Sequence, residues 1–122
     1  MRAAVIGLGW WGKQIIKCLH DSQKITITHA YDPKVDKNDS IFSDFSVSSE
    51  NDFDGIIDNP EIDAVILATP NQFHESQVIS AANKGKQVFC EKPVALKYES
   101  VKKMAQACRD NNIILGVGHE RR

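Results

Sequence analysis

The sequence predicts an α/β fold in which a single parallel sheet has helices packed on both of its faces. Short apolar runs alternate with longer amphipathic stretches along the chain, a pattern typical of strand–helix–strand units. A glycine-rich segment at residues 7–12 separates the first apolar run from the first amphipathic stretch. Later runs such as Ala64–Ala68 are continuously apolar, as expected for a strand buried on both faces. We therefore expect one domain, residues 1–122, with about six strands in the doubly wound order 3-2-1-4-5-6.

The first half of the chain is predicted to contain three strands and two helices. Apolar residues recur at helical spacing between Ile15 and Leu19, and isoleucine alternates with threonine between Ile25 and Thr28. Pro33 ends the second strand because proline cannot donate a ladder hydrogen bond. We interpret the polar, acidic residues 34–46 as a shortened or irregular connection. The expected elements are the strands Ala3–Ile6, Ile25–Tyr31 and Phe45–Ser48 and the helices Trp11–Asp21 and Phe53–Ile57.

The second half is predicted to continue the alternation without repeats or linkers. Gly85 stands where the cap at the end of a helix is expected, and a Glu-Lys-Pro sequence ends the strand that follows it. The expected elements are the strands Ala64–Ala68, Gln87–Cys90 and Ile113–Val117 and the helices Phe73–Lys84 and Tyr98–Asn112.

Composition narrows the class of protein. The chain is 42% hydrophobic and 25% charged, which is ordinary for a globular domain, and its net charge of −1 argues against a nucleic-acid or membrane-surface binder. Its apolar runs are shorter than the ~18 residues that span a bilayer. The three cysteines, Cys18, Cys90 and Cys108, are odd in number and lack metal-ligand spacing. We interpret them as small core residues with reduced thiols, and expect a cytoplasmic protein without a metal site.

The segment from Gly7 to Gly12 is a G-x-G-x-x-G motif that follows a strand and opens a helix. In that context it predicts a Rossmann-type dinucleotide site, because free N–H groups and the positive end of the helix dipole attract a pyrophosphate. Gly7 allows the tight turn, Gly9 lets the pyrophosphate approach the backbone, and Gly12 lets the helix pack on the strand. We expect Trp10 or Trp11 to pack under the loop and the other to face the cofactor or a partner; core packing alone is an equal alternative.

Asp32 ends the second strand, twenty positions after Gly12. A carboxylate there accepts hydrogen bonds from the adenosine ribose hydroxyls and repels a 2′-phosphate, so the sequence predicts NAD rather than NADP. Lys34 can partly offset that repulsion. The alternative is an ordinary turn aspartate before proline.

Three further segments resemble signatures of the glucose–fructose oxidoreductase / inositol dehydrogenase (Gfo/Idh/MocA) family. Residues 68–74, ATPNQFH, resemble its A-T-P-N-x-x-H segment after the fourth strand, and residues 85–93, GKQVFCEKP, resemble its G-K-x-V-x-x-E-K-P signature. Residues 118–122, GHERR, are similar to the segment after its sixth strand. The resemblance extends from Val5 to Arg122, and the E-K-P element is its specific part.

The resemblance implies roles for the residues in these segments. The side chains expected to line the nicotinamide half of the cofactor site are Thr69, Pro70, Asn71 and His74. For His74, a histidine that starts the helix and caps the loop is an equal alternative. For Arg121 and Arg122, a contact with the cofactor and a solvent-exposed chain terminus are equal alternatives.

Glu91 and Lys92 are expected at the cleft, where the family often has a cis bond before Pro93 that aims the lysine into the site. Lys92 is the expected catalytic residue, because a lysine there can hydrogen-bond the substrate hydroxyl and stabilise oxyanion character as hydride leaves. The alternative for Lys92 is a surface lysine before a turn.

The family also has a second α/β domain that supplies substrate contacts, an acid/base histidine and the oligomer interface, and nothing in this sequence corresponds to it. We interpret the chain as the cofactor-binding part of an NAD-dependent oxidoreductase acting on a sugar, cyclitol or related polyol, inactive by itself and open to self-association through the uncovered docking surface. The alternative is a stand-alone, non-catalytic NAD(H)-binding or sensing module. The retained Glu91 and Lys92 favour the enzyme, because a pure binder needs no catalytic lysine.

Overall fold

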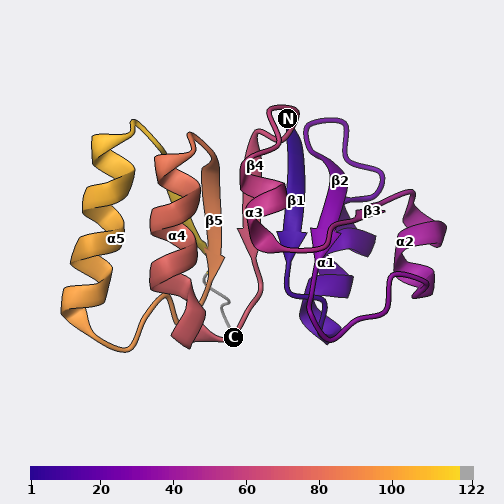
Figure 1. Ribbon diagram of the computed structural model, residues 1–122, viewed down its shortest axis with the longest axis horizontal. Helices are drawn as coiled ribbons and strands as arrows, with labels where there is room; N and C mark the ends of the chain where they lie inside the picture. The colour runs from indigo at the N-terminus through magenta and orange to yellow at the C-terminus, as the bar shows by residue number, and fades with distance from the viewer. Residues whose placement is uncertain (119–122) are drawn as a thin grey trace.

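The computed structural model describes residues 1–118, which form one six-stranded sheet (Figure 1). The strand order is β3-β2-β1-β4-β5-β6 and every pairing is parallel, so the predicted doubly wound sheet is confirmed. The strands are β1 (Arg2–Ile6), β2 (Thr26–Tyr31), β3 (Ser48–Ser49), β4 (Ala64–Leu67), β5 (Gln87–Glu91) and β6 (Leu115–Gly118). The helices are α1 (Trp10–Leu19), α2 (Ser40–Phe45), α3 (Phe53–Ile57), α4 (His74–Asn83), α5 (Tyr98–Asp110) and the 3₁₀ turn η1 (Asn71–Phe73).

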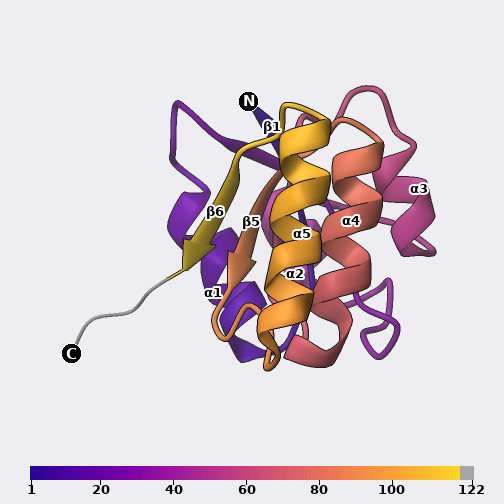
Figure 2. The ribbon, with the colours of Figure 1, turned by 90° about the vertical axis from the view of Figure 1, so that its left-hand side faces the viewer.

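Two apolar cores lie on opposite faces of the sheet. One joins the sheet to α3, α4 and α5, with Met104 and Cys108 among its buried residues. The other joins β1 and β2 to α1 and α2, through residues such as Ile16 and Phe42. Figure 2 shows α4 and α5 side by side against the β5 end of the sheet. Because both cores rest on β1 and β4, residues 3–6 of β1 and all of β4 are buried, as their apolar sequences predict.

The connection after β2 is more regular than the sequence suggested. Residues 40–45 form α2 inside the segment that we expected to be irregular, because the Asp39 carboxylate caps the helix by accepting the Ile41 N–H at 2.9 Å. Ile41 and Phe42 then bury one face of this short helix. The helix includes Phe45, so β3 begins only at Ser48, later than the strand predicted from Phe45.

The cysteines divide between the interior and the surface. Cys90 and Cys108 are buried, as predicted, whereas Cys18 is exposed on α1 and the prediction of a core position for it is wrong. No helix within residues 1–118 is long and apolar enough to cross a membrane.

One part of the sheet has an uncovered apolar face. A groove of about 560 Å³ runs along β4, β5 and β6 beside α1, with Trp11, Ile66, Phe89 and Ile114 among its lining residues. Phe89, in the strand β5, is 39% exposed there. Faces of parallel sheets are normally covered, so this groove is a surface suited to a further packing element.

Candidate functional site

The predicted site residues follow β1, β2, β4 and β5, whose carboxyl ends lie at one edge of the sheet because the strands are parallel. The loops at this edge are in direct contact. The Ala68 N–H donates to the Ile6 carbonyl at 2.8 Å, and a Cβ atom on Gly7 would lie 2.6 Å from the Ala68 carbonyl oxygen. The glycine motif after β1 therefore lies against the start of the loop after β4.

The three motif glycines have different surroundings. Gly7 has a φ of +96°, which disfavours any side chain, and its N–H donates to the Tyr31 carbonyl at 2.8 Å. A Cβ atom on Gly12 would overlap the Gly7 carbonyl oxygen, so this glycine permits α1 to pack against the turn. Gly9 has nothing within 4 Å of its Cβ position. The fold itself thus requires Gly7 and Gly12, whereas Gly9 faces open space.

The start of α1 is suited to an anion. Gly9 is its N-cap residue, no side chain caps the helix, and its first turn contains no acidic residue. The N–H groups and the positive end of the helix dipole remain available for a phosphate group. Together with the open space at Gly9, these groups fit the pyrophosphate of a dinucleotide.

Asp32 lies at the end of β2 and contacts the glycine loop. Its carboxylate accepts the Leu8 N–H at 2.8 Å through Oδ2 and the Lys34 N–H at 2.8 Å through Oδ1. Each oxygen retains a lone pair for another donor, so the residue can still accept ribose hydroxyl groups. The contact with Leu8 was not anticipated from the sequence, because only the fold brings β2 beside the loop.

The two tryptophans stack on each other at the surface. Their ring centroids are 5.9 Å apart with an interplanar angle of 27°, and Trp10 and Trp11 are 73% and 45% exposed. The expectation that one of them packs under the loop is wrong, because the close contact of Gly12 with Gly7 leaves that space filled by backbone. Trp11 instead forms a wall of the apolar groove.

The loop after β4 contains Thr69, Pro70 and Asn71. The Thr69 hydroxyl donates to Oε1 of Gln77 on α4 at 2.7 Å, whereas Pro70 is exposed and Asn71 is half-buried at the start of η1. His74 is buried, and both of its ring nitrogens contact backbone carbonyl oxygens. This geometry agrees with the alternative interpretation of His74 as a histidine that holds the loop.

The turn after β5 contains Glu91, Lys92 and Pro93. Glu91 is the last residue of β5 and is half-buried, whereas Lys92 is exposed and is joined to Pro93 by a cis peptide bond. Of the predicted residues, Arg121 lies outside the described part of the chain. The loops that contain the others form a connected series at one edge, in which Asp32 contacts Leu8, Gly7 approaches Ala68, and His74 joins Thr69 to the turn at Pro93.

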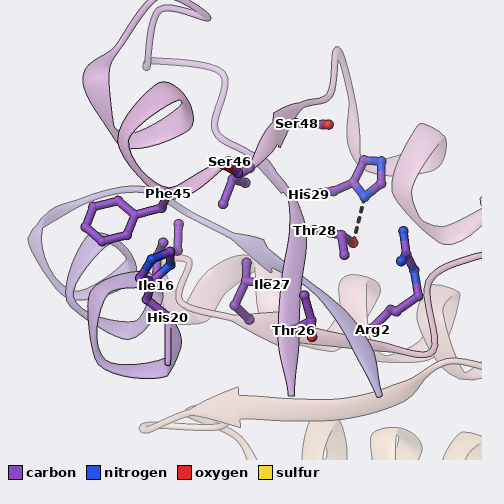
Figure 3. A pocket seen from close by; sticks show the side chains of 11 residues that line it. Arg2, Ile16, His20, Thr26, Ile27, Thr28, His29, Phe45, Ser46 and Ser48 are labelled. Atoms are coloured by element: carbon purple, nitrogen blue, oxygen red, sulfur yellow. Dashed lines mark hydrogen bonds between the residues drawn. The ribbon is translucent and has the colours of Figure 1, made fainter. Parts of the chain in front are cut away.

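A separate hollow of about 370 Å³ lies near the amino-terminal ends of β1 and β2 (Figure 3). Arg2 and His29 lie on one side of β2 and Phe45 and His20 on the other, and Nδ1 of His29 is 2.8 Å from the Thr28 hydroxyl. Because ligands of doubly wound sheets bind at the carboxyl ends of the strands, this hollow is distinct from the dinucleotide edge.

The sheet order and this edge define a dinucleotide-binding Rossmann domain. The model of the oxidoreductase family with the NAD-binding Rossmann fold, Gfo/Idh/MocA, matches residues 1–119, and the chain belongs to this family. The family resemblance of the motifs and the predicted cofactor, NAD, are thereby confirmed.

Individual relatives agree with this assignment. The chain is 36% identical over 119 residues to an oxidoreductase of Streptococcus pneumoniae, covering 98% of this chain and 32% of that protein. It is 37% identical over 117 residues to 2,7-anhydro-N-acetylneuraminate hydratase of Escherichia coli, covering 94% and 30%. The solved scyllo-inositol dehydrogenase of Lactobacillus casei, with bound NAD(H) and scyllo-inositol, superposes with a TM-score of 0.88 at 29% identity, covering 97% and 36%. The chain therefore spans about a third of the length of these relatives.

Proposed function

We propose that this chain holds NAD(H) for an oxidoreductase that transfers hydride between the nicotinamide and a sugar, cyclitol or related polyol. The connected series of loops at the carboxyl ends of β1, β2, β4 and β5 is the observation that carries the proposal. The substrate class is supported by the Lactobacillus casei relative, which binds scyllo-inositol.

Each loop has a part of the cofactor to hold. The backbone at Gly9 and the uncapped start of α1 bind the pyrophosphate, and Asp32 accepts the adenosine ribose hydroxyls. Trp10 and Trp11, at the start of α1, are exposed to solvent beside this part of the cofactor site. The nicotinamide half lies along the loops after β4 and β5, whose candidate contacts are Thr69, Pro70, Asn71, Glu91 and Lys92.

Lys92 is the proposed catalytic residue. When bound, the nicotinamide ring supplies the hydride acceptor or donor. The exposed Lys92 ammonium would donate a hydrogen bond to the substrate oxygen and stabilise its negative charge as the hydride leaves the adjoining carbon. The hydroxyl proton would pass to the acid/base histidine that the family has in its second domain.

We further propose that the chain prefers NAD to NADP because of Asp32. Removal of the carboxylate in Asp32→Ala removes both its hydrogen bonds to the ribose and its repulsion of a 2′-phosphate, effects worth on the order of 1–3 kcal/mol. The substitution also removes the acceptor for the Leu8 N–H, which weakens both cofactors alike. The ratio of the two affinities therefore reports the effect of the Asp32 charge on the choice between NAD and NADP.

Titration calorimetry of the chain with NAD and NADP measures that ratio. The expected result is tighter binding of NAD by the unmodified chain and a ratio that approaches or falls below one in Asp32→Ala. Asp36→Asn, an exposed residue in the same loop, serves as the control for the change in net charge. Equal affinities for the two cofactors in the unmodified chain would refute this selection by Asp32, and absence of binding to either would refute the cofactor site.

We also propose that the chain self-associates through the apolar groove along β4, β5 and β6. The exposed side chains of Phe89 and Ile114 lie in this groove, and their burial against a second copy of the chain would favour association. Sedimentation velocity over a concentration series measures the association. Phe89→Ser is expected to reduce it, whereas Tyr98→Ser, at an exposed aromatic residue outside the groove, leaves it unchanged; equal sedimentation of all three proteins would contradict the proposal.

A cytoplasmic location is likewise our proposal. It is supported by the three free cysteines, of which Cys90 and Cys108 are buried too deeply to form disulfides without unfolding. Fractionation of cells that express the native protein would test it, and recovery from an extracellular fraction would contradict it.

A further inference from the structure

His74 connects two loops of the candidate site through its buried imidazole ring. The residue is 1% exposed. Its Nε2 lies 2.8 Å from the Thr69 carbonyl oxygen, in the loop after β4. Its Nδ1 lies 3.1 Å from each of the Pro93 and Val94 carbonyl oxygens, in the loop after β5. One side chain thus lies between the loop for the nicotinamide half and the turn that contains Lys92.

The chemistry of these partners restricts the state of the ring. Carbonyl oxygens only accept hydrogen bonds, so each ring nitrogen must carry a hydrogen to bond its partner. A neutral imidazole has one N–H and can hold one loop, leaving a nitrogen lone pair opposite the carbonyl of the other. Both loops are held at once only by the imidazolium form. A buried ring nitrogen that lacks its hydrogen bond costs free energy, because no water can replace the missing partner.

We propose that His74 is a positioning residue that, with a hydrogen on both ring nitrogens, holds the Lys92–Pro93 turn against the Thr69 loop. The turn depends on this contact more than the other loop does. Thr69 has a second link through its hydroxyl to Gln77. Within residues 92–97, by contrast, His74 is the one side chain of the described chain that hydrogen-bonds to the backbone.

Apart from its carbonyl partners, the surroundings of the ring give a positive charge little support. Burial and the amino-terminal end of α4, where His74 is the first residue, both disfavour a cation. Glu75 follows it on α4, Glu91 ends β5 and Lys92 lies in the turn, but none of the ion pairs within residues 1–118 includes His74. The carbonyl dipoles of Thr69, Pro93 and Val94 therefore provide the compensation. If either ring nitrogen lacked its hydrogen, the link to one of the two loops would be missing.

Nitrogen-15 NMR of the histidine rings tests the protonation directly. Long-range proton–nitrogen spectra of the labelled chain distinguish a protonated ring nitrogen from a bare one, and the signal lost in His74→Gln assigns the residue. We expect the spectra of the folded chain to show a hydrogen on both ring nitrogens of His74. A bare ring nitrogen at His74 in the folded chain would overturn the proposal.

Variants test the positioning role. His74→Phe keeps a ring but removes both donors, whereas His74→Gln keeps an amide donor for one carbonyl. His20→Gln, at an exposed histidine, is the control. We expect the Phe variant to move the amide signals of residues 92–95 but not those of residues 7–12, the Gln variant to restore part of that change, and the control to alter neither. Unchanged signals at residues 92–95 in the Phe variant would overturn the proposal.

Cofactor affinity provides a second readout that rests on the proposed function. Loss of charge-assisted hydrogen bonds by the turn is expected to weaken NADH binding in His74→Phe by about tenfold, with partial recovery in His74→Gln. If the unmodified chain binds no NADH, the proposed function fails, while the NMR measurements still decide whether His74 positions the turn.

Discussion

Gly9 is the position where the needs of the fold and of the ligand differ most clearly, because an added methyl group there is expected to weaken cofactor binding without harming the structure. Gly9 has ordinary backbone angles, φ −69° and ψ −169°, and no atom within 4 Å of its Cβ position. Alanine can therefore adopt the same conformation in the free protein. The methyl group instead enters the space that the proposed pyrophosphate occupies.

The two free energies differ in size. For unfolding, Gly9→Ala gains about 0.4–1 kcal/mol from a less flexible unfolded chain and loses a similar amount, about 0.5–1 kcal/mol, because alanine is a poor N-cap residue. The net change in stability is close to zero. For binding, interference with N–H bonds to a charged phosphate costs about 1.5–3 kcal/mol, a loss of affinity of about tenfold to a hundredfold.

Gly12→Ala is the matched control at the same loop. Its Cβ would overlap the Gly7 carbonyl oxygen, so α1 must move away from the turn, and overpacking of this kind costs about 1–3 kcal/mol or more in stability. Urea denaturation measures both free energies of unfolding, and fluorescence titration with NADH measures the affinities. Unreduced NADH affinity in Gly9→Ala, with the fold intact, would refute the placement of the pyrophosphate at this loop.

Three further predictions concern the buried groups Lys86 and Cys90. Lys86 is 6% exposed and its ammonium donates to the Asn59 and Ile62 carbonyl oxygens, both at 2.6 Å. Lys86→Met should lower the free energy of unfolding, measured by urea denaturation, by about 1–3 kcal/mol because it leaves these carbonyls unpaired. Lys84→Met removes only an exposed ion pair with Asp58 and should lower it by less than about 1 kcal/mol. Equal losses in the two variants would contradict this reasoning. Burial lowers the pKa of Lys86 below its usual 10.5, so the unfolded chain binds more protons between the two pKa values and this group makes stability rise with pH in that alkaline window. Burial, followed by the charge of Glu91, raises the pKa of Cys90 to about 12, so a thiol reagent should label Cys18 in the native chain and reach Cys90 and Cys108 only after denaturation; rapid native labelling of Cys90 would contradict its burial.

The fold was predictable from local patterns because parallel strands buried on both faces have continuous apolar sequences, as in Ala64–Leu67. The exceptions occurred where the local signal is weak. Only two apolar residues, Ile41 and Phe42, bury one face of α2, and its cap at Asp39 looks in sequence like any other acid in an acidic stretch. The prediction that Trp10 or Trp11 packs under the loop was wrong because the G-x-G-x-x-G pattern does not determine where the side chains at its variable positions point, and in the fold both rings are exposed.

Residue types at the candidate site were predictable, but their partners within the protein were not. The motifs identified Asp32 and His74 as candidate ligand contacts, yet in the fold each also bonds the backbone of another loop. Such contacts join residues far apart in the chain, Asp32 with Leu8 and His74 with Pro93, and no spacing rule indicates them.

This double use of side chains determines how variants at the edge should be interpreted. A substitution at Asp32 or His74 changes a contact that the free protein already makes, so a loss of cofactor affinity combines a lost ligand contact with a displaced loop. Gly9 lacks any such contact in the free protein, and its substitution changes only the space available to the ligand. If the cofactor occupies this edge, the Gly9 variant should lower the affinities for NAD and NADP by the same factor, because both share the pyrophosphate, whereas the Asp32 variant should change their ratio, because only the ribose end differs. The reverse pattern, a changed ratio at Gly9 and a uniform loss at Asp32, would mean that the dinucleotide lies across the loops in a different orientation.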